Sequence, residues 1–202
     1  MQAILSMDVI TLLPLVMLDY ARKAHLAVMN GYSTRYEPLQ ALLLTATAGE
    51  AAVNFMLEPL LGTTDWQAIE RWGQERKWTR LSKELGLTPK LEKTEKPLRG
   101  FLATLEARHH VVHFQRGKNV QRMESPPFPV ASGMPMSEMR VVGPPAAAED
   151  VLRPENAVTY YPSLEKLLRA VLPAYRKRED GLGLYFELAL DGKVTEQQDI
   201  AP

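Results

Sequence analysis

The chain has 202 residues, is 46% hydrophobic and carries 24 basic and 24 acidic residues. This length and composition predict a single globular domain over residues 1–202 and exclude a fibrous repeat, while the zero net charge excludes binding to nucleic acid through the field of the whole molecule. The sequence has no cysteine, which excludes a disulfide framework and thiolate metal sites. With no signal peptide and no membrane-spanning run in view, we expect a cytoplasmic protein that does not contact a membrane.

Both ends of the chain contain short segments typical of β-strands. Apolar and polar residues alternate over residues 2–9, a period of two that favours a strand. Residues 184–190 are rich in strand-forming residues and precede Asp191-Gly192, which is a turn signal. We therefore expect these segments to pair as a small antiparallel β element beside a helical core of about residues 12–178.

Two helices are predicted in the first third of that core. The first runs from residue 12 to Met29 and is ended by Asn30-Gly31. The second, and the strongest helix signal in the chain, runs from residue 38 to 61 and is closed by Gly62. Its apolar seam places Glu50 and Asn54 on or beside the buried face, where a carboxylate needs a partner. These two side chains either tie down neighbouring groups or shape an active cleft.

Residues 65–85 are expected to form shorter helices that contain all three tryptophans. A spacing of six residues scatters Trp66, Trp72 and Trp78 around a helix, which favours core anchors over a platform on which bases stack. The same stretch carries a basic patch that is either a solvated helix face or a contact for RNA. The residues of this patch are Arg71, Arg76, Lys77, Arg80 and Lys83.

The next predicted helix spans residues 97–114, and its apolar spacing of three and four places His109 on the core-facing side. A proline-rich insertion of about residues 117–159 follows, and a loop of this length is usually functional or flexible. An amphipathic helix then begins near Ser163 and closes the core at about Tyr175. The whole pattern predicts a mainly α protein, a bundle of four to five helices.

Three of the four histidines lie in the run Arg108-His109-His110-Val111-Val112-His113. A histidine gives and takes protons near neutral pH, and an arginine is a permanent cation. Such a pair at a helix end suits phosphodiester chemistry. His109 and His113 are one helical turn apart and could bind zinc, but no further histidine or cysteine cluster supplies other ligands, which favours a mechanism without metal or cofactor.

The chain resembles the HEPN-domain family in three segments. The family signature is an arginine, a polar residue and then a histidine four to six residues along, at the end of a helix; Arg108, His109 and His113 match it in that order. Residues 42–57, which include Glu50 and Asn54, resemble the second helix of the family. Residues 160–175 resemble its closing helix, so the similarity covers about residues 12–178.

This resemblance implies a helical bundle that dimerises so that two copies of the motif face one cleft. It also implies a metal-independent endoribonuclease, acting as the toxin of a toxin–antitoxin or phage-defence system, with RNA as substrate and an antitoxin protein as a further partner. His113 would be the general base or acid at the ribose 2′-hydroxyl and Arg108 would stabilise charge on phosphorus. His109 would position the scissile phosphate or orient His113, with Glu50 and Asn54 in support, and His110 has no assigned role.

A second interpretation stays open, because many relatives with this fold are not known to cleave anything. In that case the protein is a non-catalytic HEPN-type binding or adaptor module, and Arg108 and His113 are structural hydrogen-bonding groups. Cleavage of RNA in the presence of EDTA distinguishes the two interpretations.

Overall fold

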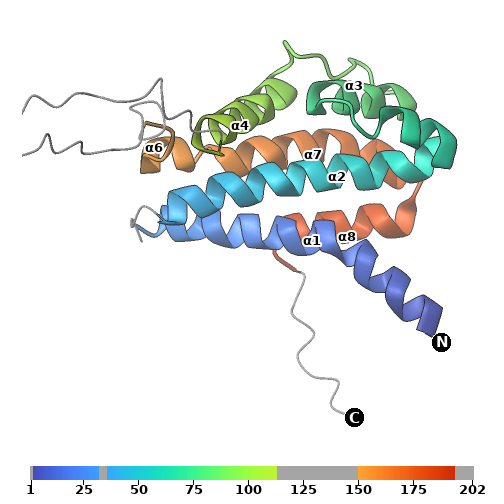
Figure 1. Cartoon of the computed structure of the whole chain (residues 1–202), viewed down its shortest axis with the longest axis horizontal. Helices are drawn as coiled ribbons and strands as arrows, with labels where there is room; N and C mark the ends of the chain where they lie inside the picture. The colour runs from blue at the N-terminus through green and yellow to red at the C-terminus, as the bar shows by residue number, and fades with distance from the viewer. Residues whose placement is uncertain (1, 32–35, 113–149, 194–202) are drawn as a thin grey trace, which may run out of the picture.

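The computed structural model describes residues 2–31, 36–112 and 150–193, and the regular structure in this part of the chain is helical (Figure 1). The mainly α bundle predicted from the sequence is therefore confirmed. The elements, in chain order, are α1 (Gln2–Met29), α2 (Tyr36–Ile69), α3 (Gln74–Glu84), α4 (Lys96–Val112), α6 (Pro154–Ala157), α7 (Tyr160–Arg176) and α8 (Asp180–Leu190). Among the described residues no helix is both long enough and apolar enough to cross a membrane.

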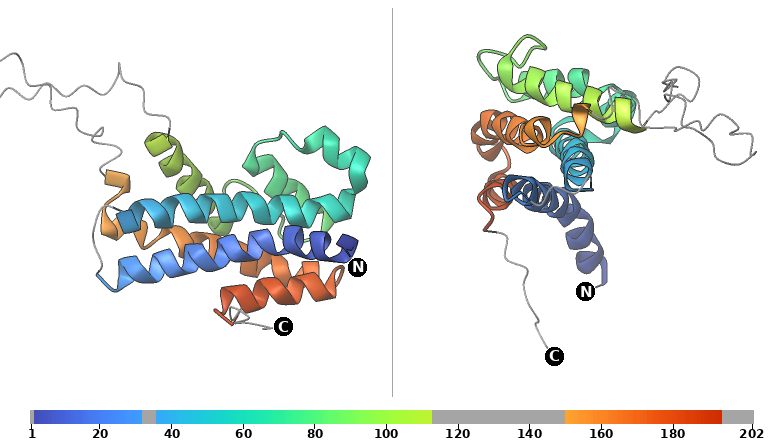
Figure 2. Two further views of the ribbon diagram at one scale, coloured as in Figure 1. Left: turned by 60° about the horizontal axis from the view of Figure 1, so that its bottom comes forward. Right: turned by 90° about the vertical axis from the view of Figure 1, so that its left-hand side faces the viewer.

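The helices form three layers, which are clearest when the bundle is viewed along its length (Figure 2). Helices α3 and α4 form one outer layer, α2 and α7 the middle layer, and α1 and α8 the other outer layer. The middle layer packs against both others, with α2 touching α1, α3, α4 and α7. The main hydrophobic core lies around α2 and α7, so these two helices set the position of α4 and its motif.

Helix α7 shows why the sequence folds in this way. Its apolar residues recur every three or four positions, which gives one face of a helix a continuous hydrophobic stripe. All of them are buried in the core, as the sequence predicts. These residues are Leu164, Leu167, Leu168, Val171, Leu172 and Tyr175.

The predicted β element at the termini is wrong, because both segments are helices. Residues 2–9 belong to α1; four of these eight residues are glutamine, alanine, leucine or methionine, which are good helix formers, and none is glycine or proline. In α8 the buried positions are Gly183, Phe186, Ala189 and Leu190, a spacing of three that fits a helix face. Short apolar segments match both periods, and the docking of α8 against α1 and α7 selects the helix.

The helical core also extends beyond the predicted limits of residues 12–178, to residue 2 at one end and residue 190 at the other. The predicted proline-rich insertion is shorter at its C-terminal end, because Pro154 opens the short helix α6. Proline suits the first helical turn, where its missing N–H is not needed. Residues 117–149 of that insertion lie outside the described residues.

Gly62 marks a sharp break inside α2, at the position where the sequence predicts a helix end. Its backbone angles are φ 71° and ψ 168°, a region that is essentially restricted to glycine. A Cβ at this position would meet no other atom within 4 Å, so the backbone conformation alone demands glycine.

We therefore expect Gly62→Ala to lower the free energy of unfolding by about 1–3 kcal/mol, measured by urea denaturation. Gly73→Ala is the matched control, because Gly73 also has open space around it but adopts φ −63° and ψ 155°, which alanine accepts. Because Gly73 is the N-cap of α3, where alanine is less favourable than glycine, the control should cost less than about 1 kcal/mol. Equal losses in the two variants would show that the backbone of Gly62 is not the cause.

Candidate functional site

The face that α4 buries is set by small residues as well as large ones. Leu98, Phe101, Thr104 and Ala107 are the buried positions, spaced three residues apart, and the Thr104 hydroxyl donates a hydrogen bond to the Gly100 carbonyl at 3.3 Å. This satisfied hydroxyl can be buried without penalty. Small side chains let α4 lie close to its neighbours, so the contact follows this row of residues.

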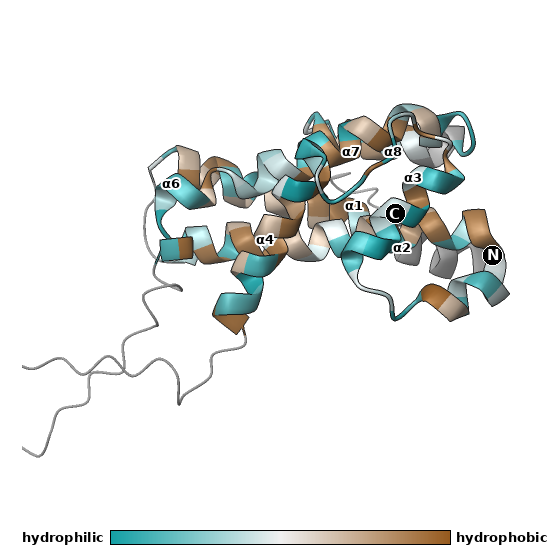
Figure 3. Ribbon diagram, turned by 90° about the horizontal axis from the view of Figure 1, so that it is seen from above, coloured by the Kyte–Doolittle hydropathy of each residue, from teal (hydrophilic) through white to brown (hydrophobic). Residues whose placement is uncertain are grey.

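The prediction that His109 faces the core is wrong for that reason. Ala107 occupies the core-facing position of the last full turn, and both His109 and His110 are exposed. Their rings are 6.4 Å apart in an edge-on arrangement. In Figure 3 the last turns of α4 are mostly hydrophilic and extend away from the rest of the bundle. The polar end of α4 is thus open to a ligand from solvent.

Arg108 is held at this end by one carboxylate from α2. Its Nη1 lies 3.5 Å from Oε1 of Glu50, and the two side chains are 36% and 31% exposed. A guanidinium offers five donors in a planar fork, and this long contact engages it only at one edge. Sequence reasoning placed both residues in the candidate site, and the structure brings them together.

Asn54 lies one turn further along α2 and has a different partner. Its Oδ1 accepts a hydrogen bond of 2.8 Å from Nζ of Lys77 on α3. The Lys77 residue is only 3% exposed, and its ammonium lies 5.1 Å from the centre of the Trp66 ring. Burial lowers the pKa of Lys77, and the negative charges of Glu50 and Glu70 oppose that shift. Asn54 therefore anchors α3 to α2.

Glu50 consequently lies between two cations. It forms the ion pair with Arg108 on α4 and also acts electrostatically on Lys77 of α3. A single carboxylate on the middle layer thus faces a basic group from each helix of the outer layer. This arrangement stabilises the negative charge of Glu50, whose carboxylate holds the Arg108 guanidinium beside α2.

The prediction that Lys77 belongs to an exposed basic patch is wrong, because this residue is buried. A signal for its burial is present in the sequence. Residues 77, 78, 81, 82 and 85 are all buried, and this spacing is that of a single helix face. Lys77 belongs to that face, whereas Arg76 and Lys83 lie on the exposed side.

The Asn54–Lys77 bond can be tested by a double-mutant cycle in urea denaturation. We expect Asn54→Leu to lower the free energy of unfolding by about 1.5–3 kcal/mol, because the buried ammonium loses its acceptor. The pair of changes Asn54→Leu and Lys77→Met should cost about 1 kcal/mol or less, because no buried charge remains. Additive losses would contradict a direct interaction.

The third residue of the motif, His113, follows the last residue of α4 and lies outside the described residues. The nearby basic residues Arg116, Lys118 and Arg122 lie outside them as well. Within the described ranges no cluster of three or more histidine, cysteine, aspartate or glutamate side chains could hold a metal ion. The described part of the site therefore consists of Arg108, His109 and Glu50.

Comparison with protein-family models, with curated proteins and with solved structures finds no significant match. What the protein does must therefore be inferred from its own residues.

Proposed function

We propose that the protein is a metal-independent endoribonuclease of the HEPN type, whose chemistry is carried by Arg108 and His113. The observation that supports this proposal is the position of Arg108. Its guanidinium is partly exposed on the last turns of α4, beside the exposed His109, and is held by one long ion pair to Glu50. An arginine placed in this way can engage a phosphate with its remaining donors.

The proposed reaction divides the work between the two ends of the motif. His113 takes the proton from a ribose 2′-hydroxyl, the 2′-oxygen forms a bond to the adjacent phosphorus, and the bond from phosphorus to the 5′-oxygen breaks. The departing 5′-oxygen receives a proton, which leaves a 2′,3′-cyclic phosphate and a 5′-hydroxyl. Arg108 stabilises the charge that develops on the non-bridging oxygens, and His109 positions the phosphate.

In this proposal two copies of the chain form a homodimer, so that two motifs face a shared cleft. Cleavage of cellular RNA would suit the toxin of a toxin–antitoxin or phage-defence system, with an antitoxin as partner.

The test is an RNA-cleavage assay with purified protein, single-stranded RNA and EDTA. The wild type should cut the RNA in EDTA, and His113→Ala should reduce the rate by at least about 100-fold, because general acid–base catalysis contributes 10²–10⁴. His110→Ala is the matched control, because His110 is also exposed but has no assigned role, and it should cut at close to the wild-type rate. Cleavage only in the presence of a divalent metal would contradict the proposed chemistry.

A second candidate is a non-catalytic HEPN-type binding or adaptor module. The observation that favours it is the same ion pair, because a carboxylate 3.5 Å from Arg108 neutralises part of the charge that a phosphate would use. This module would cut no RNA in either the wild type or the variants.

A further inference from the structure

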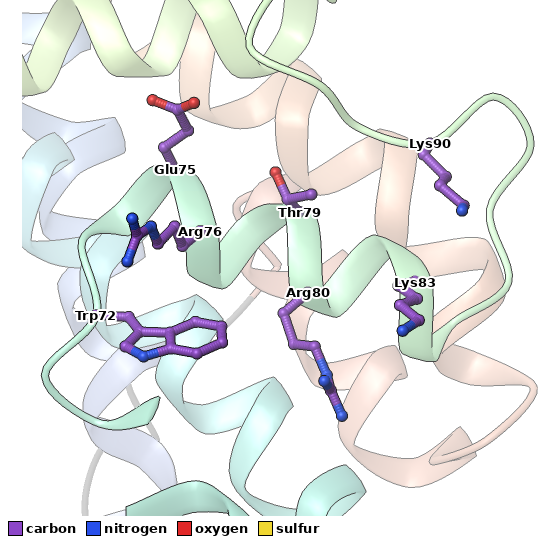
Figure 4. A pocket seen from close by; sticks show the side chains of 7 residues that line it. All are labelled: Trp72, Glu75, Arg76, Thr79, Arg80, Lys83 and Lys90. Atoms are coloured by element: carbon purple, nitrogen blue, oxygen red, sulfur yellow. The ribbon is translucent and has the colours of Figure 1, made fainter. Parts of the chain in front are cut away.

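A second basic site lies on α3, apart from the motif. A pocket of about 390 Å³ opens there, and the indole of Trp72 forms part of its wall (Figure 4). Four cationic side chains line it: Arg76, Arg80, Lys83 and Lys90. Figure 4 shows the Trp72 ring with the side chains of Arg76 and Arg80, which come from α3 and line the same pocket. The pocket therefore combines a flat aromatic surface with positive charge.

Most of that charge is available to a ligand. Among the described residues no ion pair involves Arg76, Lys83 or Lys90. The Nε of Arg80 lies 2.7 Å from a carboxylate oxygen of Glu84. The two groups are not aligned for a hydrogen bond, and this Nε has no hydrogen-bond partner among the described residues. The one acidic lining residue, Glu75, lies 3.6 Å from Lys93.

The sequence around this pocket is strongly basic within a neutral chain. Residues 71–99 contain nine of the 24 basic residues and four of the 24 acidic residues. The rest of the chain must therefore carry an equal net negative charge. Such segregation creates a local positive field that attracts polyanions even when the whole molecule is neutral.

Trp72 is unusual among the three tryptophans, which were all predicted to be core anchors. Trp78 is fully buried and packs edge-on against Phe101, and Trp66 packs beneath the Lys77 ammonium. Trp72 instead is 37% exposed, so the core-anchor prediction is wrong for this residue. An exposed indole among arginines is a surface on which a nucleic-acid base can stack.

We propose that the α3 pocket binds single-stranded RNA, with phosphates contacting Arg76, Lys83 and Lys90 and a base stacked on Trp72. An acidic peptide would satisfy the charges but would leave the indole unused, whereas single-stranded nucleic acid uses both. This inference rests on the proposed function and extends it, because it assigns a second contact to the same substrate.

The α3 pocket and the motif lie on two helices that touch each other. Helices α3 and α4 belong to the same outer layer, with α3 beside the N-terminal end of α4 and Arg108 in the C-terminal part of α4 (Figure 1). From Lys96 to Arg108, α4 is about 18 Å long at 1.5 Å per residue. The α3 pocket would hold the RNA strand while the motif cleaves the strand at a distance from the pocket.

Binding can be measured without cleavage in the Arg108→Ala background, in EDTA, by fluorescence anisotropy of a fluorescein-labelled 12-nucleotide oligouridylate. We expect Trp72→Ala to raise the Kd about 5- to 100-fold, as for loss of one stacked base. Trp72→Phe, which keeps an aromatic ring, should restore most of the affinity. Thermal unfolding checks that each variant is folded.

The cationic contacts have their own readout, which is salt dependence. Arg76→Gln with Lys83→Gln should weaken binding and reduce the slope of log K against log salt by about 1.4, because each phosphate contact to a single strand contributes about 0.7. Lys166→Gln with Lys177→Gln is the matched control, since both lysines are exposed on α7 or at its end. This control should leave the slope unchanged.

Three results would overturn the inference: unchanged affinity in the Trp72→Ala variant, an equal loss in the Lys166 and Lys177 control, or equally tight binding of polyglutamate. The two proposals fail separately. If the wild type cuts no RNA but the pocket variants bind it less tightly, the α3 pocket stands and the ribonuclease falls. If the wild type cuts RNA and the pocket variants bind RNA with unchanged affinity, the ribonuclease proposal stands and the α3 pocket proposal falls.

Discussion

The Arg108→Ala protein should cut single-stranded RNA at least about 100-fold more slowly than the wild type and should remain folded. Removing one group that stabilises transition-state charge typically costs a factor of 10²–10³ in rate. The stability should change by about 1 kcal/mol or less, because the ion pair to Glu50 is long and partly exposed. Initial cleavage rates in EDTA and urea denaturation measure the two effects.

Two further variants sharpen this prediction. Arg108→Lys keeps the charge but loses the planar fork, so it should fall between the wild type and the alanine variant. Arg178→Ala removes an exposed arginine two residues beyond the end of α7 and should leave cleavage unchanged. Arg108 would have a structural role if Arg108→Ala lowered the free energy of unfolding by several kcal/mol and the cleavage rate fell only in proportion to the fraction of unfolded protein.

The second large effect concerns the contact that places α4 on α2. Phe101 is fully buried, and Phe101→Ala should lower the free energy of unfolding by about 3–5 kcal/mol, as for other aromatic side chains deleted from a core. The ring lies directly over Gly49 of α2, where an added Cβ would be 2.1 Å from Cζ of Phe101. Urea denaturation measures the loss.

Because a Cβ at Gly49 cannot fit beneath that ring, Gly49→Ala should cost about 1–3 kcal/mol. The same change made in a Phe101→Leu background should cost much less, or even stabilise, because alanine favours a helix by up to about 1 kcal/mol over glycine once the clash is gone. Such a difference between backgrounds measures the coupling directly. Equal effects of Gly49→Ala in both backgrounds would contradict the close approach of α4 to α2.

Much of the fold follows from helical periodicity and glycine positions. The buried face of α7 lies where its apolar spacing predicts, and the predicted breaks at Gly31 and Gly62 both have positive φ. The strand predictions at the termini are wrong because a segment of only seven or eight residues can match both the period of a strand and the period of a helix. For α8 the helix is selected by its packing against α1 and α7, which the local pattern does not contain.

The site could be predicted only in part, for reasons that are also physical. The spacing of Glu50 and Asn54 places both near the buried face, and both are half-buried. Their partners come from different helices, Arg108 from α4 and Lys77 from α3, which a one-dimensional pattern does not reveal. The spacing of the large apolar residues in α4 predicts a core position for His109. The buried row instead runs through Thr104, whose hydroxyl is satisfied within its own helix.

Cleavage by the motif at the end of α4 through the 2′-hydroxyl of the RNA substrate is tested most directly with a matched pair of oligonucleotides. One is DNA with a single ribonucleotide, and the other is the same sequence with deoxyribose at that position. In EDTA the wild type should cut the first only on the 3′ side of the ribose, leaving a 2′,3′-cyclic phosphate. It should leave the second intact. Cleavage of both oligonucleotides would contradict a mechanism that needs the 2′-hydroxyl. Cleavage of neither, under conditions in which all-RNA substrates are bound, would contradict it as well.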